Sequence, residues 1–443
     1  MTDAPHPVES PRTTAVRIIA AWLKSGAFPS RMLEDIAMDR AWLTETVLGV
    51  VRRYGTLRWL LRRYTKHLPE GVAEAAVYVG WYELLFMEHT APYAAVNEAV
   101  EATRALGAAQ ATGLVNALLR KAALEREHWR RDLDAQPPPV RLSHPPTLFS
   151  RWARQWGQRD AIRLCQWNNE PAETFIRPRT TLADYLKRLQ AEGIQAEPHP
   201  FDPIRFLRLP RGVAPRTLPG YAEGLFYVQD PATAIAVDLL DPHPGETVLD
   251  ACAAPGGKTL LMADRLAGRG RLVACDLHED RLTRLRENLA RSGHADVALC
   301  CADFSAWSDD ILRRLMPDGR RFDAILLDVP CTNTGVIRRR PEVRWTFSAA
   351  RLERITAIQQ RLLDAAARLV APTGRIVYST CSLEPEEDEG MIQRWLHDHP
   401  DWQAVRARKL FPPNSGTDGV YAVLLKRRQG EKSVASPAGT VSL

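Results

Sequence analysis

The chain has 443 residues, enough for about three domains. Its hydrophobic content of 45% and charged content of 25% are typical of a globular protein, and no run of 18 apolar residues predicts a membrane helix. A net charge of +6 is compatible with a polyanionic partner but does not establish one. The N-terminus lacks the apolar segment of a signal peptide, so we expect a cytoplasmic protein with no membrane partner.

Cysteine usage excludes two kinds of site. Cysteines stand at positions 165, 252, 275, 300, 301, 331 and 381, with no C-x-x-C pair and no Cys/His spacing typical of zinc. We therefore expect reduced thiols, no structural disulfide and no metal.

The first 130 residues predict a helical bundle. Residues 1–12 are polar and proline-rich, which favours disorder. Residues 13–130 carry apolar residues at helical spacing. Within them, residues 72–85 have apolar side chains on two adjoining faces, which predicts a central, buried helix.

One stretch of this bundle interleaves cations with aromatic residues. The cations are Arg52, Arg53, Arg58, Arg62, Arg63 and Lys66, and the aromatic residues are Tyr54, Trp59 and Tyr64. Such a mixture can bind RNA through phosphate contacts and stacking. The alternative is a solvated face whose aromatic side chains point inward, and this stretch alone slightly favours that alternative.

Three further segments of the bundle resemble the RNA-binding fold of the NusB antitermination factor. They are WYELLFM at 81–87, AAVNEAV at 94–100 and GLVNALLR at 113–120. The resemblance implies that residues 13–130 form an RNA-binding domain.

Residues 131–229 predict a linker followed by a small α/β unit. The linker is proline-rich between Asp132 and Pro146. Strands are expected at 174–179, 204–209 and 224–228, and a helix at 181–192 with a capping box of Thr181 and Asp184. This unit could present RNA to a catalytic domain or serve as a spacer.

A glycine turn at 246–259, ETVLDACAAPGGKT, opens the third region. It predicts a strand ending at Asp250, a turn containing Pro255, Gly256 and Gly257, and a helix from Lys258. A P-loop would need glycine at Cys252, and the G-x-G-x-x-G fingerprint is missing. What remains is a turn that holds a nucleoside without a phosphate chain, for which S-adenosylmethionine is the commonest ligand.

Four successive predicted strands each deliver a carboxylate near their carboxyl end. These carboxylates belong to Asp250, Asp276, Asp303 and Asp328. Open α/β sheets bind ligands at this edge, and a second-strand acid such as Asp276 takes ribose hydroxyls. Turn or N-cap roles are the alternative for any single Asp, but they explain all four poorly.

Two thiols follow predicted strands at the same edge, in DVPC at 328–331 and YSTC at 378–381. Cys331 or Cys381 alone is more often a buried apolar residue than a nucleophile. Together they suit pyrimidine chemistry. A thiolate that adds to carbon 6 activates carbon 5 for methylation, and a nearby base must then remove the proton from carbon 5.

These motifs, with RRRPE at 338–342, Trp345, EPEED at 384–388 and VQDP at 228–231, resemble the RNA cytosine-C5 methyltransferase family of Sun/Nop2-type enzymes. The resemblance implies Cys381 as the nucleophile and Cys331 as the residue that assists release. It also implies that Asp328 hydrogen-bonds the cytosine and that Lys258 is among the catalytic residues. The implied cofactor and base pocket comprises Cys252, Ala253, Ala254, Pro255, Gly256, Gly257, Lys258, Asp276, Asp303 and Asp328.

The fold expected is therefore multidomain, with a doubly wound, Rossmann-like class I methyltransferase domain at 230–428 after the bundle and the α/β unit. A disordered tail is expected at 429–443. The function implied is methylation of a cytosine in RNA, most simply 16S ribosomal RNA, by a monomer. Transfer RNA as substrate, and an inactive RNA-binding ribosome assembly factor, remain alternatives.

Overall fold

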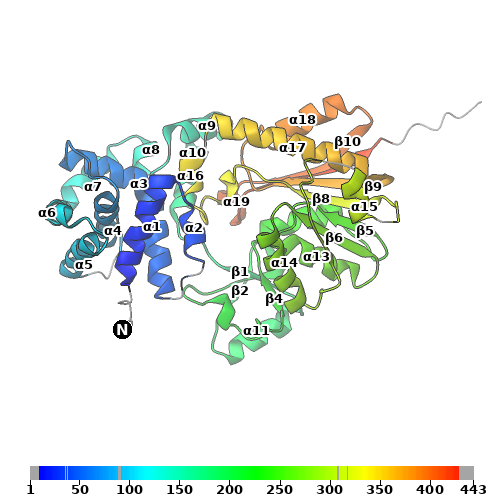
Figure 1. Ribbon diagram of the computed structural model, residues 1–443, viewed down its shortest axis with the longest axis horizontal. Helices are drawn as coiled ribbons and strands as arrows, with labels where there is room; N and C mark the ends of the chain where they lie inside the picture. The colour runs from blue at the N-terminus through cyan, green and yellow to red at the C-terminus, as the bar shows by residue number, and fades with distance from the viewer. Residues whose placement is uncertain are drawn as a thin grey trace, which may run out of the picture. The chain divides into compact units, whose positions relative to one another are not determined.

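The computed structural model describes residues 9–34, 36, 38–87, 91–306, 309–316 and 318–428 (Figure 1). The chain divides into two compact units. The first contains residues up to 219 together with 332–352 and 410–419, and the second contains 220–331, 353–409 and the chain from 420. The tail expected at 429–443 lies outside the described residues, as do residues 1–8 of the expected disordered N-terminus.

The first unit begins with the predicted helical bundle. Its helices are α1 (Pro11–Ser25), α2 (Pro29–Met32), α3 (Arg40–Tyr64), α4 (Val72–Phe86), α5 (Pro92–Ala105), α6 (Thr112–Leu124) and α7 (Arg126–Asp134), with the 3-10 turn η1 (Ala109–Ala111). Helix α4 is buried on nearly every face, as its apolar pattern predicts. Residues 11 and 12 were expected to be disordered. They form the start of α1 instead, because the Ser10 side chain caps the helix by accepting from Thr13 N.

The basic stretch of α3 divides into buried and exposed side chains. Tyr54, Trp59 and Tyr64 pack against the bundle core, as the inward-facing alternative predicts. Arg52 is also buried, with 5% of its surface exposed, so it cannot belong to a solvated cationic face. The exposed cations of the stretch are Arg58, Arg62, Arg63 and Lys66.

The segment expected to be a linker, from Asp132 to Pro146, is about half helical. It contains the end of α7 and the whole of α8 (Pro138–Arg141), and it is followed by α9 (Pro146–Trp156) and α10 (Gln158–Asn169). The prolines that suggested a flexible linker lie at the first positions of α8 and α9, where a missing N–H costs nothing. The linker prediction was therefore wrong for about half of this segment.

The small α/β unit has the three predicted strands, β1 (Phe175–Pro178), β3 (Asp202–Arg208) and β4 (Phe226–Val228), and one that was not predicted, β2 (Glu197–His199). Strands β1 and β2 both pair antiparallel with β3. Helix α11 (Leu182–Ala191) starts at the predicted cap, where Thr181 Oγ1 accepts from Asp184 N at 3.2 Å. Strand β2 carries only three residues, one of them Pro198, which explains why its pattern was not recognised.

Two segments from the second half of the chain complete the first unit. They carry η4 (Thr334–Val336), α16 (Val343–Thr346) and α19 (Pro412–Ser415). Arg344 is fully buried and donates to the carbonyl oxygens of Arg52, Ser143 and Asn168. Trp345 Nε1 donates to Val51 O at 2.8 Å. These residues of the second half therefore anchor the bundle.

The second unit is a doubly wound α/β domain, as predicted. Its sheet is built from β5 (Thr247–Asp250), β6 (Arg271–Asp276), β7 (Ala298–Cys301), β8 (Phe322–Asp328), β9 (Val370–Thr380), β10 (Trp402–Leu410) and β11 (Val420–Arg427). Its helical segments are η3 (Pro231–Thr233), α12 (Ala234–Leu240), α13 (Gly257–Leu266), α14 (Glu279–Arg291), α15 (Asp309–Leu315), α17 (Ala349–Leu369) and α18 (Glu389–Asp398). Figure 1 shows α13 and α14 on one side of its sheet and α17 and α18 on the other.

The seven-stranded sheet has the order β10-β11-β9-β8-β5-β6-β7. Strands β9, β8, β5, β6 and β7 run parallel, and β11 pairs antiparallel with β9. Because β5 lies between β8 and β6, the chain order reverses on either side of β5. The carboxyl end of β5 is therefore the topological switch point, where such sheets bind their ligands.

Candidate active site

The glycine turn after β5 is fixed by side chains from its neighbours. Arg281 Nη2 donates to Ala254 O at 2.7 Å, and Asn288 Nδ2 donates to Pro255 O at 3.1 Å. Leu285 lies between those two residues on the same face of α14, because positions i, i+4 and i+7 share a helix face. A Cβ at Gly256, whose φ is +110°, would lie 2.4 Å from Leu285, so this position requires glycine.

A second set of side chains reaches the turn from the segment before the domain. Tyr227 OH donates to Pro255 O at 3.2 Å, and Gln229 Nε2 donates to Gly257 O at 3.3 Å. A Cβ at Gly257 would lie 3.0 Å from the Tyr227 ring. The VQDP motif at 228–231 has no role that the sequence alone predicts. In the structure, Gln229 of this motif holds the glycine turn.

The four predicted carboxylates have different environments. Asp250 is fully buried, and burial raises its pKa to about 7 although Thr259 Oγ1 donates to it at 2.7 Å. Asp276 is 3% exposed and accepts from Ala254 N, His278 N and Arg281 Nη1, each at 3.2 Å. Asp303 is exposed and accepts from the backbone and hydroxyl of Ser305.

Asp328 forms an ion pair with Lys258. The Nζ of Lys258 lies 2.6 Å from Asp328 Oδ2, so the first turn of α13 is joined to the carboxyl end of β8. Burial works to lower the pKa of Lys258, but the negative charges of Asp328 and Cys381 outweigh it and raise that pKa above its usual value. Cys381 therefore lies within electrostatic reach of the ion pair.

The two predicted catalytic thiols are adjacent. Cys331 Sγ and Cys381 Sγ are 3.3 Å apart, after neighbouring strands β8 and β9. Cys331 is 5% exposed, whereas Cys381 is half-buried and more accessible. Cys252, also predicted to line the pocket, is half-buried like Cys381, and burial raises the pKa of its thiol.

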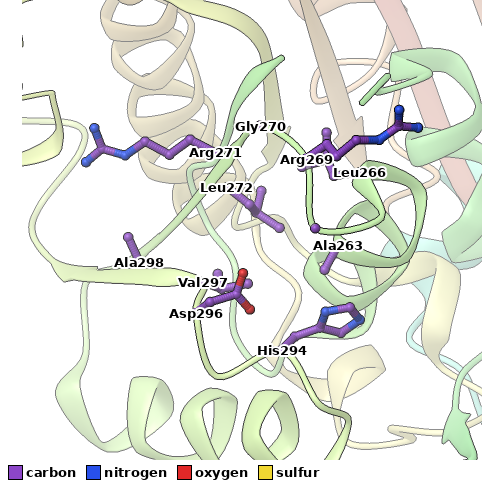
Figure 2. Close-up of a pocket in the computed structure, with 11 residues that line it drawn as sticks. Ala263, Leu266, Arg269, Gly270, Arg271, Leu272, His294, Asp296, Val297 and Ala298 are labelled. Atoms are coloured by element: carbon purple, nitrogen blue, oxygen red, sulfur yellow. The ribbon is translucent and has the colours of Figure 1, made fainter. Parts of the chain in front are cut away.

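A pocket at the opposite edge of the sheet is separate from these groups. It has a volume of about 150 Å³ and lies where β6 and β7 begin, lined by residues that include Arg271, Leu272, His294, Asp296 and Ala298 (Figure 2). Because β6 runs from Arg271 to Asp276, the acids and thiols lie at its other end. This pocket is therefore not the catalytic site.

The residues around the glycine turn fit S-adenosylmethionine. The end of β6 offers the Asp276 carboxylate to hydroxyl groups, and the neighbouring acids suit a ligand with a sulfonium and an amino group. Three of roughly four acceptor positions on the Asp276 carboxylate are already used, so a bidentate ribose contact would require Arg281 to move.

No helix in the described part of the chain is long and apolar enough to span a membrane.

Family models match three regions of the chain. Residues 237–426 match the 16S rRNA methyltransferase RsmB/F model, residues 9–124 match the NusB family, and residues 144–211 match the ferredoxin-like domain of RsmF/B-like methyltransferases. The three matches follow the order of the helical bundle, the small α/β unit and the doubly wound domain.

Similar proteins span almost the whole chain. The probable ribosomal RNA small subunit methyltransferase B of Synechocystis sp. is 33% identical over 406 residues, covering 87% of this chain and 88% of the relative. Ribosomal RNA small subunit methyltransferase B of Vibrio cholerae is 33% identical over 424 residues, covering 91% and 93%. The solved structure of PH0851 shares the fold, with a TM-score of 0.79 and 24% identity over 94% of this chain and 99% of that one. The chain belongs to the RsmB/F family of 16S rRNA methyltransferases, and its activity is the S-adenosylmethionine-dependent methylation of a cytosine at carbon 5.

Proposed function

We propose that Cys381 is the nucleophile of this reaction and that Cys331 is the base that allows product release. The observation that carries the proposal is the 3.3 Å separation of the two sulfur atoms beside the Lys258–Asp328 pair. A nucleophile and a base that act on adjacent carbons of one ring must approach each other this closely. Cys381 is the more accessible thiol, which suits the group that attacks RNA.

The reaction then assigns one task to each side chain. The Cys381 thiolate forms a bond to carbon 6 of the cytosine, and the displaced electrons make carbon 5 nucleophilic. S-adenosylmethionine, held by the 252–258 turn, Asp276 and Asp303, supplies the electrophilic methyl group. Cys331 takes the proton from carbon 5, the carbon 5–carbon 6 double bond re-forms, and Cys381 leaves as thiolate. Asp328, fixed by Lys258, hydrogen-bonds the cytosine edge.

The test is to trap the adduct. Cys331→Ala should still attack and methylate but should stall before elimination, so a protein–RNA adduct should survive denaturing electrophoresis. Cys381→Ala should form no adduct and should be inactive. An adduct with Cys381→Ala but not with Cys331→Ala would reverse the two roles. Full turnover by both variants would show that the two cysteines are only core residues.

The remaining functional assignments follow from the family. The NusB-like residues 13–130 bind RNA, residues 131–229 present it, and residues 230–428 perform catalysis. The exposed cations Arg58, Arg62, Arg63 and Lys66 support the first assignment. Because one chain carries both thiols and the whole turn, we expect a monomer, which light scattering can check. Because ribosomal RNA is cytoplasmic in bacteria, we expect the protein there.

A further inference from the structure

Beneath the two thiols lies a buried network that the reaction itself does not use. The Glu387 carboxyl group is fully buried, with Ser382 Oγ donating to its Oε2 and Gln359 Nε2 donating to its Oε1 at 3.1 Å. Gln359 Nε2 also donates to Pro330 O at 2.9 Å. Pro330 immediately precedes Cys331, and Ser382 immediately follows Cys381. One hydrogen-bonded chain therefore runs from the first thiol-bearing loop to the second.

The Cys381 loop is held from its other side as well. Thr380 Oγ1 donates to Asp388 Oδ1 at 2.7 Å and accepts from Ser382 N at 3.2 Å. Lys409 Nζ lies 3.1 Å from the same Asp388 carboxyl group. The two consecutive acids Glu387 and Asp388 thus fix the residues on both sides of Cys381.

The Cys331 loop has a different form of support. The backbone register of β8 and β9 ends at the pair Asp328–Ser379, followed by one further bond from Val329 N to Ser379 O at 3.0 Å. Cys331 lies two residues beyond that bond. The Gln359 amide group on α17 reaches the loop at Pro330 O, directly before the thiol.

We propose that Gln359 and Glu387 are positioning residues that set the separation between the Cys331 and Cys381 sulfur atoms. The proposal rests on the roles assigned to the two thiols above. Elimination requires the Cys331 sulfur to reach the proton on carbon 5 while Cys381 is bonded to carbon 6, so a small displacement of one loop lowers the release rate. Buried polar groups are costly when unpaired, and this network pairs Gln359 Nε2 and both Glu387 carboxyl oxygens across the two loops.

Substitutions at the two ends of the network should have different effects on attack and release. Gln359→Leu removes the bonds to Pro330 O and Glu387 but leaves the Ser382–Glu387 bond. Release should therefore slow more than attack. We expect turnover to fall at least tenfold, single-turnover methyl transfer to fall less than threefold, and the covalent adduct to accumulate. Ser382→Ala affects the Cys381 end and should slow attack without accumulation of the adduct.

Two further variants separate positioning from folding. Glu387→Gln retains an acceptor toward Gln359 and a polar partner for Ser382, so it should restore most of the turnover that Glu387→Ala loses. Gln360→Leu changes the exposed neighbour on the same helix and should behave as wild type. If Gln359→Leu fails to fold, Gln359→Met serves instead, because it keeps the length of the side chain and removes the amide donor without adding a charge beside Glu387.

The experiment measures turnover, single-turnover methyl transfer, the adduct fraction on denaturing gels and the thermal midpoint of the full-length protein with its RNA. The proposal is overturned if Gln359→Leu keeps normal turnover, or if it lowers attack and release equally without adduct. Cys331→Ala is run in parallel. If Cys331→Ala itself accumulates no adduct, the assigned thiol roles have failed rather than the positioning by Gln359 and Glu387.

Discussion

Lys258 Nζ lies 2.6 Å from Asp328 Oδ2 and joins the first turn of α13 to the carboxyl end of β8. The Lys258 side chain is 14% exposed and the Asp328 side chain is 33% exposed, so water reaches the carboxylate more easily than the ammonium group. Because Cys381 also acts electrostatically on Lys258, the pair links the glycine turn to the thiol that we propose as the nucleophile.

The first prediction concerns this ion pair. Lys258→Met should lower single-turnover methyl transfer at least tenfold, because Asp328 would then place an uncompensated negative charge beside the Cys381 thiolate. Asp328→Asn removes the carboxylate charge from the proposed contact with the cytosine and should also be slow. The double variant should lose less than the two single effects combined, because the residues act as a unit. Additive losses would contradict the coupling.

The second prediction concerns Asp276. Asp276→Ala should weaken S-adenosylmethionine binding at least tenfold by calorimetry, because each charge-assisted hydrogen bond contributes about 1.5–3 kcal/mol. The substitution also frees Ala254 N in the turn, so Asp276→Asn serves as the milder comparison. Arg281→Gln tests whether the ribose displaces Arg281. Unchanged affinity in Asp276→Ala would show that this strand end does not hold the cofactor.

The third prediction concerns RNA binding by the bundle. Deleting residues 1–130 would remove the carbonyl groups that Arg344 and Trp345 contact, so point substitutions give a cleaner test. The triple variant Arg58→Gln, Arg62→Gln, Lys66→Gln should bind RNA more weakly and bind S-adenosylmethionine normally. Each lost phosphate contact should flatten the slope of log K against log salt by about 0.7–0.9.

A matched control for that experiment replaces exposed cations of the second unit, Arg313 and Arg320, by glutamine. If the control weakens RNA binding as much as the triple variant does, the bundle has no special role. An unchanged salt slope in the triple variant would lead to the same conclusion.

The fourth prediction concerns stability of the first unit. Arg344 is fully buried, and burial holds its pKa well below the usual value for arginine. Arg344→Met would leave the carbonyl groups of Arg52, Ser143 and Asn168 without this donor. We expect a loss on the order of 3 kcal/mol or more in the free energy of unfolding. Arg340→Gln, at an exposed position of the same segment, should change stability little in denaturant titrations.

The fifth prediction concerns pH. Burial raises the pKa of Asp250 from 3.8 to about 7 in the folded protein. Between those values the folded state retains a proton that the unfolded state has lost, so this group's contribution to stability falls as the pH rises from about 4 to 7. Asp250→Asn should remove that dependence. Relative to wild type, the variant should be more stable at pH 8 than at pH 5, and an equal difference at both values would contradict the assignment.

The sequence by itself determined the location of the site. Local patterns identify where each strand of the second unit ends, and parallel strands bring their carboxyl ends to one edge, so Asp250, Asp276 and Asp328 could be placed near Cys331 and Cys381. The roles of Cys331 and Cys381 came from the resemblance to a family, because spacing along the chain does not show that two thiols act together. Helix α11 was predictable because its cap and apolar face are local.

Only the tertiary structure decided which contacts form between segments that are distant in the chain. Helical spacing places Arg281, Leu285 and Asn288 on one face, but it does not show that this face holds the glycine turn. The basic segment at 338–344 does not show by its composition that Arg344 is buried among backbone carbonyl groups. The contact between Gln359 and Pro330, which joins α17 to the loop before Cys331, could likewise not be predicted from the sequence. Each is set by packing between elements, whose energy depends on the whole fold rather than on local sequence.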